Sequence, residues 1–258
     1  MIGDHKQLRP KPYNFQIAHQ YNFDISMFER LINNNIQYAT LKYQRRMKPI
    51  FAEFVRIIYG ETTYRDHQSV YNRPPVQGIE KDMYIITHEN PELENENLAS
   101  KSNEYEAKYL IRLCNYLLQQ NYKEEQITIL TLYVGQVLLL RNEAKKYNIN
   151  VRISSVDNYQ GEECDIILLS LVRSNKKYEI GFLKTFNRVC VAFSRAKIGF
   201  YIIGNLDCII KGEELNLTKK EKKNQPKNIF EIKKEEDRDE NKMERVWKQV
   251  KELAEKII

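Results

Sequence analysis

The 258-residue chain lacks any apolar run of about 18 residues, the length that a membrane-spanning helix needs. Its N-terminus also lacks the apolar region of a secretory signal peptide. These absences predict a protein with no membrane partner. We expect it to work inside the cell, in the cytoplasm or the nucleus.

Metal-binding patterns are missing as well. The chain has four cysteines and four histidines, but no two cysteines form a CxxC pair and the histidines are scattered. We therefore expect no metal site. Three of the cysteines lie within or beside apolar runs, which predicts small core residues in a reducing compartment. The cysteines are Cys114, Cys164, Cys190 and Cys208.

The charge balance excludes little. A net charge of +6 permits nucleic-acid binding without requiring it, because the distribution of charge matters more than its sum. The sequence contains no GxxxxGK[ST], the loop whose lysine and backbone amides cradle nucleotide phosphates. It also lacks acids clustered at metal-site spacing, which leaves a nuclease or phosphatase as a weak hypothesis.

Periodicity predicts a doubly wound α/β fold for the middle of the chain. Asp165 to Val172 is a nearly continuous apolar run, as expected for a strand buried on both faces of a parallel sheet. Strands alternate with amphipathic helices, which predicts right-handed βαβ crossovers. The predicted strands are 37–43, 83–87, 127–132, 152–156, 165–172 and 199–204, and the predicted helices are 24–34, 49–59, 102–120, 135–147, 182–195 and 206–211.

Three other predictions concern packing. Residues 90–101 are polar and are expected to form a surface loop. In the following helix we expect a stripe to face inward that consists of Tyr105, Tyr109, Leu113, Tyr116 and Leu117. Near the C-terminus, a short near-heptad stripe around Trp247 predicts a helix that docks on its own domain.

The segment SVDNYQGEECDIILLSLVRSN, followed by GFLKTFNRVCVAFSRAKIGFYIIGN, resembles motifs V and VI of superfamily 1 helicases. The chain is most similar to the branch that includes the nonsense-mediated-decay helicase, and within it to NFX-type zinc-finger-containing helicases. Long paired motifs in the expected order are far more specific than a lone glycine pattern. The resemblance covers residues 1–205 and implies a RecA-like, P-loop NTPase-like fold, in which a parallel sheet is flanked by helices.

The resemblance implies a nucleotide site with two catalytic arginines. LKYQRRMKP, residues 41–49, resembles a block in which Arg46 matches the arginine that contacts the triphosphate. Arg195 in VAFSRAK matches the motif VI arginine finger. Guanidinium groups suit both tasks because they are always charged and fork onto two oxygens.

Three further residues complete the implied ATP site. MIGDHKQLRP resembles motif III, in which the glutamine at Gln7 senses the γ-phosphate. Glu163 matches the motif V glutamate near the ribose and triphosphate, and Gly161 lies where the backbone must turn tightly. We expect Arg46 and Arg195 to converge near these residues at the carboxyl ends of strands, with neither arginine paired to a carboxylate of this domain.

The same resemblance implies contacts with single-stranded nucleic acid. Ser155, at the start of motif V, matches a position that contacts the backbone. Tyr133 and Gln136, in LYVGQ, lie after a strand where the family often has PYxxQ, although the proline is absent here. RNA and DNA both remain open as the bound strand.

These motifs divide the chain into four expected segments. Residues 1–36 would be a remnant of a first RecA-like domain, and residues 37–211 the second RecA-like domain. Residues 212–239 are rich in lysine and glutamate and predict a flexible linker, and residues 240–258 predict a terminal helix. In the family, the phosphate-binding loop and the magnesium box lie upstream of motif III, where this chain begins.

Two hypotheses follow. In the first, the chain is the second motor domain of an ATP-dependent RNA or DNA helicase, active with ATP and Mg²⁺ only beside a first RecA-like domain of the same protein. In the second, it is a catalytically inert module that keeps the fold and binds RNA or a protein. The missing GxxxxGK[ST] separates them, because only the first hypothesis needs another domain to supply it.

Overall fold

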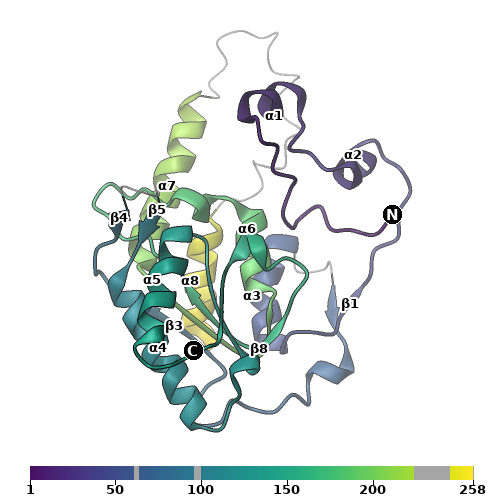
Figure 1. The fold of residues 1–258 in the computed structure, drawn as a ribbon. Helices are drawn as coiled ribbons and strands as arrows, with labels where there is room; N and C mark the ends of the chain where they lie inside the picture. Colours follow the sequence, from purple (N-terminus) through teal and green to yellow (C-terminus); the bar gives the residue numbers. More distant parts are fainter. Residues whose placement is uncertain (61–63, 96–99, 224–244, 258) are drawn as a thin grey trace.

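The computed structural model describes residues 1–60, 64–95, 100–223 and 245–257 (Figure 1). The helices are α1 Phe15–Tyr21, α2 Met27–Asn33, α3 Pro49–Tyr59, α4 Glu104–Gln119, α5 Val134–Lys145, α6 Phe186–Phe193, α7 Leu206–Lys223 and α8 Val246–Ile257. The strands are β1 Tyr43–Gln44, β2 Arg65–Asp66, β3 Met83–Thr87, β4 Leu93–Asn95, β5 Ser100–Ser102, β6 Ile127–Thr131, β7 Arg152–Ser155, β8 Cys164–Ser170 and β9 Ala196–Gly204. Short 3₁₀ helices are η1 Gln68–Val70, η2 Glu124–Gln126, η3 Val156–Asn158 and η4 Gly181–Lys184.

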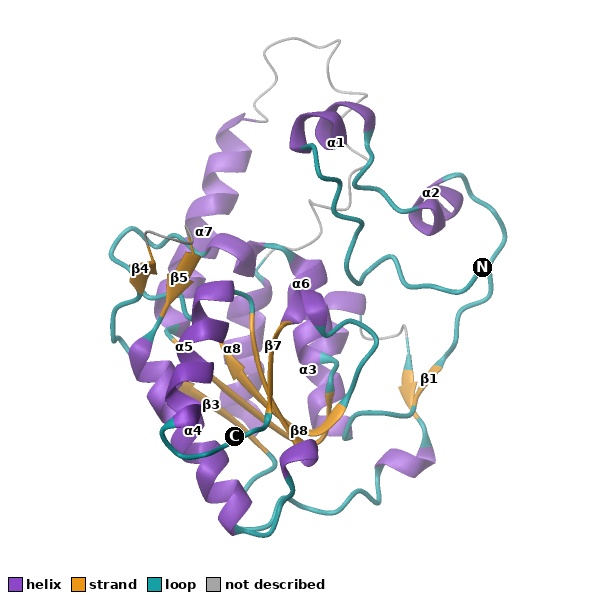
Figure 2. Ribbon diagram, viewed as in Figure 1, coloured by secondary structure: helices purple, strands orange, loops and turns teal. Residues whose placement is uncertain are grey.

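Five of these strands form one parallel sheet in the order β3-β9-β8-β6-β7 (Figure 2). The central strand β8 pairs with β9 on one side and β6 on the other. Its alternate residues go to opposite faces, with Ile166 and Leu168 in one apolar cluster and Ile167 and Leu169 in the other. The predicted parallel α/β fold, with a central strand buried on both faces, is therefore confirmed.

Helices cover both faces of the sheet. Helices α4 and α5 contribute to one apolar cluster, and α3, α6, α7 and α8 contribute to the other. Because α6 leads directly toward β9, it carries the chain from the carboxyl edge of the sheet to its amino edge. The two sheet edges are therefore joined by one short, fully packed helix.

The C-terminal helix α8 docks as predicted. Trp247 is 1% exposed, meets the Phe193 ring edge-on at 5.8 Å, and donates its indole N–H to the Leu183 carbonyl at 3.0 Å. The buried Glu213 of α7 caps α8 by accepting the Trp247 backbone N–H at 3.1 Å. The carboxylate thereby supplies an acceptor for backbone N–H groups in the first turn, which have none within the helix.

Two predicted boundaries are wrong. Residues 37–42 are exposed and form no strand, and only Tyr43–Gln44 pairs, with β2. Without a neighbouring strand, the backbone N–H and C=O groups of an alternating segment bond to water, and no sheet stabilises the extended conformation. Residues 93–95 and 100–102 form the antiparallel pair β4–β5, although residues 90–101 were expected in a surface loop and residue 102 in the following helix.

The expected orientation of α4 is wrong for its three tyrosines, although Leu117 is buried as predicted. Tyr105, Tyr109 and Tyr116 are 36–41% exposed, whereas the buried side of the helix carries smaller apolar residues. Both stripes repeat with the helical period, so periodicity alone did not separate them. The buried stripe comprises Ala107, Leu110, Ile111, Cys114 and Leu117.

Helix α7 is longer than predicted, because it continues through residues 212–223, where a linker was expected to begin. Its mixed charges are compatible with a solvated helix as well as with a linker. The remainder of the predicted linker, residues 224–239, lies outside the described residues. Among the described helices, none has the length and apolar character to cross a bilayer.

The docking of α8 predicts the effect of removing its anchor. Trp247→Ala should lower the free energy of unfolding by about 3–5 kcal/mol, since it deletes a large buried side chain. Urea denaturation followed by circular dichroism would measure this. Tryptophan fluorescence cannot be used, because the substitution removes the only tryptophan. The control Glu252→Ala, on an exposed position of the same helix, should change stability by no more than about 0.5 kcal/mol. Equal effects of the two substitutions would contradict the docking.

Candidate functional site

A cluster of charged side chains lies at the amino edge of the sheet. Glu163 immediately precedes β8, and Arg195 immediately precedes β9. Arg46 lies three residues before α3, whose preceding residue Lys48 donates its backbone N–H to the Lys197 carbonyl at 3.2 Å. Segments separated by more than 100 residues therefore meet because two neighbouring parallel strands start side by side.

Arg195 is the most buried charge in the cluster, at 1% exposure. Its guanidinium donates to the carbonyls of Val191 at 2.9 Å and Glu162 at 3.1 Å. It also donates to the Ser194 hydroxyl at 2.7 Å and the Gln7 amide oxygen at 3.2 Å. These acceptors are all neutral. Burial, followed by the nearby Arg46 charge, lowers the pKa of Arg195 to about 10.

Arg46 lies beside Arg195 but has an acidic partner. Its Nε donates to Glu163 Oε2 at 2.5 Å, and its Nη1 donates to the Ser194 carbonyl at 3.0 Å. The other Glu163 oxygen lies 3.0 Å from Lys197 Nζ. Hydrogen bonds from Arg46 and Lys197 lower the pKa of Glu163 to about 2, against the opposing effect of desolvation.

Gln7 reaches this cluster from the N-terminal segment. Besides accepting from Arg195, its side-chain amide donates to Asp4 Oδ2 at 2.9 Å. Asn187 of α6 donates to the Gln7 backbone carbonyl at 2.6 Å, and the Tyr59 hydroxyl hydrogen-bonds to Asp4. The segment that carries Gln7 is therefore tied to both α3 and α6.

Gly161 lies in the turn that precedes Glu163. Its φ of +83° lies in the left-handed region, and a Cβ placed there would meet no atom within 4 Å. The glycine is therefore needed for the turn and not for close packing. The five predicted nucleotide-site residues, Gln7, Arg46, Gly161, Glu163 and Arg195, are brought to one region by the fold.

Two details of the expected geometry are corrected. The cluster lies at the amino ends of β8 and β9, not at carboxyl ends, because each charged residue comes just before its strand. Arg46 is also paired with a carboxylate, Glu163, although its side chain remains 30% exposed. Arg195 has no carboxylate partner among the described residues, as expected.

The predicted nucleic-acid residues lie at the opposite edge, where β6 and β7 end. Ser155 is the last residue of β7 and is 9% exposed. Gln136 is fully buried, and its side-chain amide bonds to the Asn103 backbone and to Ser170. Tyr133 is 3% exposed and donates its hydroxyl to the Ile180 carbonyl. Direct contact of Tyr133 or Gln136 with a strand does not fit this burial.

Sequence reasoning missed two members of the charged cluster. Ser194 receives Arg46 at its carbonyl and Arg195 at its hydroxyl. Lys197, the second residue of strand β9, binds Glu163. The strand period of two places Lys197 on the same side as Arg195, so alternation could have indicated it. Ser194 carries no such signal, because one of its two contacts is made by the backbone carbonyl, which every residue has.

No metal-binding cluster accompanies this site. Among the described residues, no group of three or more His, Cys, Asp or Glu side chains has the arrangement to hold a metal ion. The four cysteines are free and buried, and burial raises the pKa of each thiol, to about 12 for Cys114 and Cys190. The expectation of cysteines as core residues is therefore confirmed.

Comparison with known proteins identifies the family. The AAA domain family matches residues 23–207, which form most of the chain. The chain belongs to the AAA domain family. With the five-stranded parallel sheet, this membership confirms the RecA-like α/β fold.

Relatives of this AAA domain include helicases. It is 44% identical over 82% of its length to mouse NFX1-type zinc finger-containing protein 1, of which it covers 11%. It is 38% identical over 83% of its length to the Schizosaccharomyces pombe helicase required for RNAi-mediated heterochromatin assembly 1, and 32% identical over 80% to Saccharomyces cerevisiae ATP-dependent helicase NAM7; it covers 22% of each. The resemblance to this helicase branch is confirmed, and the chain spans less than a quarter of these relatives.

The pairing of Glu163 predicts a pH dependence. Its pKa in the folded protein is below the ordinary 4.5, so the pair contributes stability that is present above about pH 4.5 and is lost as pH falls toward about 2. Glu163→Gln should therefore lower the urea midpoint at pH 7 and have a declining effect below pH 4.5. Because the Glu163 side chain is 41% exposed, we expect no more than about 1 kcal/mol. The exposed control Glu252→Gln should show no such decline, and a constant Glu163→Gln effect down to about pH 2 would contradict the pairing.

Proposed function

We propose that this chain is the second motor domain of an ATP-dependent superfamily 1 helicase that moves on single-stranded RNA or DNA inside the cell. In this proposal it supplies charge-neutralising arginines to a triphosphate held mainly by a first RecA-like domain. The sequence itself contains no GxxxxGK[ST], so the phosphate cradle must come from another domain. The relatives named as helicases support the class of activity.

The buried guanidinium of Arg195 carries the proposal. A charged group taken out of water costs several kcal/mol unless an opposite charge compensates it. Arg195 is 1% exposed and bonds only to neutral oxygens among the described residues, while Arg46 adds a second positive charge nearby. Such a site is stabilised by an anion from outside the domain. A γ-phosphate at a domain interface has the charge and the oxygen acceptors to fill that role.

The surrounding residues can then be given distinct tasks. Arg195 would stabilise negative charge that develops during phosphoryl transfer, and its neutral acceptors would hold the guanidinium in place. Arg46 would contact the triphosphate after exchanging Glu163 for a phosphate oxygen, since a carboxylate and a phosphate compete for the same donors. Gln7, bonded to Arg195, would report the presence of the γ-phosphate.

Mg²⁺ does not fit the described residues of this chain. They contain no cluster of acidic or histidine side chains suited to a metal ion. Magnesium bound in a helicase neutralises phosphate charge, and in this proposal its ligands lie in the first domain and on the nucleotide. We therefore assign this chain the arginine contacts alone.

The nucleic-acid contacts of this proposal lie at the carboxyl edge, where Ser155 ends β7. Helix α6 joins this edge to the nucleotide edge, with Arg188 in its first turn and Arg195 after its last. Arg188 is bonded to Asp157, two residues beyond Ser155, at 3.0 Å and 3.3 Å. A nucleic-acid strand bound at Ser155 would therefore lie next to Asp157 and, through Arg188, contact helix α6, which leads to the arginine finger Arg195.

The inert-module hypothesis has one observation in its favour, the closure of Arg46 by Glu163. A site that has lost its nucleotide could retain such a pair for stability. Arg195, which has no carboxylate partner among the described residues, argues against it, because an inert module gains nothing from a desolvated cation. The two hypotheses differ in what Arg195 contributes to hydrolysis.

Arg195→Ala should reduce ATP hydrolysis by about 10³-fold or more in a polypeptide that joins this chain to a first motor domain carrying GxxxxGK[ST]. Arg195→Lys should also be strongly impaired, because lysine keeps the charge but lacks the fork. Steady-state hydrolysis with saturating single-stranded RNA or DNA measures both. Arg112→Ala, at an exposed position of α4 on the other face of the sheet, is the matched control and should hydrolyse normally.

The chain without such a domain should show no hydrolysis. Thermal melts of each variant would confirm that Arg195 substitutions leave a folded protein. Normal hydrolysis by folded Arg195→Ala, or strand-stimulated hydrolysis by the chain alone, would overturn the proposal. The first result would favour the inert module.

A further inference from the structure

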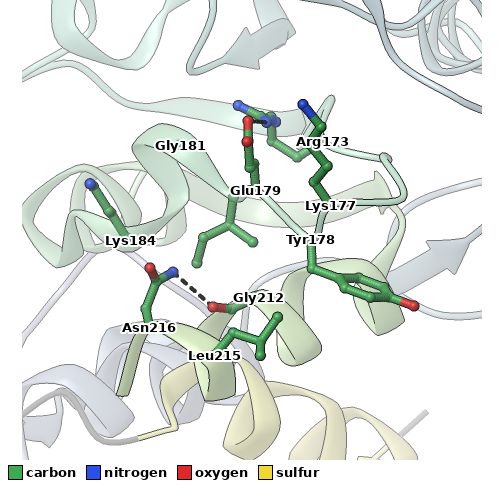
Figure 3. Close-up of a pocket in the computed structure, with 10 residues that line it drawn as sticks. Arg173, Lys177, Tyr178, Glu179, Gly181, Lys184, Gly212, Leu215 and Asn216 are labelled. Atoms are coloured by element: carbon green, nitrogen blue, oxygen red, sulfur yellow. Dashed lines mark hydrogen bonds and ion pairs between the residues drawn. The ribbon is translucent and has the colours of Figure 1, made fainter. Parts of the chain in front are cut away.

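A pocket at the carboxyl edge of the sheet lies outside the nucleotide cluster. It is formed by the loop that follows β8, by η4 and by one side of α7, and its volume is about 260 Å³ (Figure 3). This is several times the ~30 Å³ that a water molecule occupies in the liquid. The residues that line it and carry the argument are Arg173, Lys177, Glu179, Lys184, Gly212 and Asn216.

Positive charge predominates in this pocket. Its lining includes Arg173, Lys177 and Lys184 with one acid, Glu179, and Figure 3 places Arg173 beside Glu179 with Lys184 across the pocket. Because Glu92, outside the lining, already pairs with Arg173, the excess positive charge comes from the two lysines. Lys177 and Lys184 are exposed and have no ion pair with another described residue. Converging cations with few acids provide a field that attracts an anion.

Arg173 has a donor without an acceptor. Its side chain is 6% exposed, and its Nε donates to the buried Glu92 carboxylate at 2.9 Å. Its Nη2 is buried with no hydrogen-bond partner among the described residues. Glu179 Oε2 lies 3.8 Å away, within reach of an ion pair but too far for a hydrogen bond. A buried donor of this kind is costly, and an incoming oxygen that accepts from it is correspondingly favoured.

The backbone that presents Arg173 is strained. Val172 has a φ of +70°, a conformation that β-branched residues rarely adopt. The buried Glu106 holds it by accepting the Val172 N–H at 2.9 Å, and Asn103 donates to the Val172 carbonyl at 3.3 Å. Strain of this kind persists where the surroundings over-determine it, and it is concentrated at functional sites.

We propose that this pocket receives a backbone phosphate of the single strand, with Arg173 Nη2 as its buried donor and Lys184 at its rim. This inference rests on the proposed function, because it names a contact of the strand that the motor domain would hold. A phosphodiester supplies the charge and the acceptor that the pocket lacks. Glu179, whose side chain is 63% exposed, must turn away to admit it.

An exposed aromatic ring beside the pocket supports a nucleic acid over a free anion. Phe182, in the same 3₁₀ helix as Lys184, is 45% exposed. Tyr133 packs 5.3 Å from its centroid, and the Arg188 guanidinium lies 4.3 Å from it. Single-strand sites combine such a supported aromatic ring with cations that follow the backbone. Tyr133, predicted as a contact, would then act by supporting Phe182.

The first test removes the competing acid. Glu179→Gln should tighten binding of a labelled single-stranded oligouridine by about two- to fivefold, since it removes a negative charge from the path of the phosphate. Fluorescence anisotropy on the 258-residue chain measures this. Glu53→Gln is the matched control, because it makes the same charge change at an exposed acid on α3 that does not line the pocket. Equal effects of the two substitutions would overturn the pocket.

The second test removes a cation at the rim. Lys184→Ala should weaken binding and flatten the slope of log affinity against log salt by about 0.7, the value for one phosphate contact with a single strand. Lys146→Ala is the control, because Lys146 follows α5 at the end that lies away from the carboxyl edge. Lys184 and Glu179 are exposed, so both variants should fold, and melting temperatures would verify this.

The outcomes separate this inference from the proposed function. If Glu179→Gln and Lys184→Ala leave strand affinity unchanged, the pocket is refuted, whereas the proposed motor-domain function is not. Binding of millimolar inorganic phosphate to the wild-type chain, with no binding of the labelled strand, would identify a free-anion site and overturn the strand contact. In the two-domain polypeptide, Arg195→Ala should reduce hydrolysis by about 10³-fold, and in the 258-residue chain it should leave strand affinity unchanged. Normal hydrolysis by Arg195→Ala, together with the predicted binding changes in Glu179→Gln and Lys184→Ala, would count against the proposed function while supporting the pocket.

Discussion

The desolvated guanidinium of Arg195 is the constraint on which the arrangement of the site depends. A cation with 1% exposure would destabilise the fold if its donors were unsatisfied. The chain meets this requirement with neutral oxygens from α6, from the residue before Glu163, and from the N-terminal segment. Three regions that are distant in sequence are thereby held together around one charge, and no acid among the described residues neutralises it.

Helix α6 couples this constraint to the rest of the domain. It begins near the carboxyl edge of the sheet, where Arg188 bonds to Asp157, and it ends at Arg195 on the amino edge. Trp247 of α8 packs against Phe193, two residues before Arg195, and bonds to the carbonyl of Leu183 in η4. The same tryptophan therefore contacts the segments that lead to both edges. A change in the docking of α8 would alter the packing of both segments.

A carboxylate stands beside an arginine at each edge. Glu163 pairs with Arg46 at the amino edge, and Glu179 lies near Arg173 at the carboxyl edge. Both acids are well exposed, at 41% and 63% of their side chains, whereas Arg195 and Arg173 are buried. An exposed acid can be displaced by a phosphate at little cost, because its pairing contributes little in high dielectric. The proposals for both edges therefore include the same physical exchange, in which a phosphate replaces an exposed carboxylate.

Much of the architecture could be predicted from the sequence, because local periodicity reports burial directly. The apolar run of β8, the amphipathic α3 and the stripe of α8 indicated a buried parallel strand, a surface helix and a docked terminal helix, and the structure has all three. The paired motifs V and VI also identified Glu163 and Arg195, and the block at residues 41–49 identified Arg46; the fold brings all three together. Periodicity was insufficient where two stripes share one period, as on α4, and where a strand pattern has no neighbour, as at residues 37–42.

The tertiary structure alone decided how these residues are oriented and paired. No local pattern indicates that Glu163 bonds to Arg46, or that Arg195 has only neutral acceptors among the described residues. The burial of Gln136, the strain at Val172 and the unpartnered donor of Arg173 likewise depend on contacts between distant segments. The reason is physical: sequence determines which groups are apolar or charged, whereas burial and pairing depend on which neighbours remove the water.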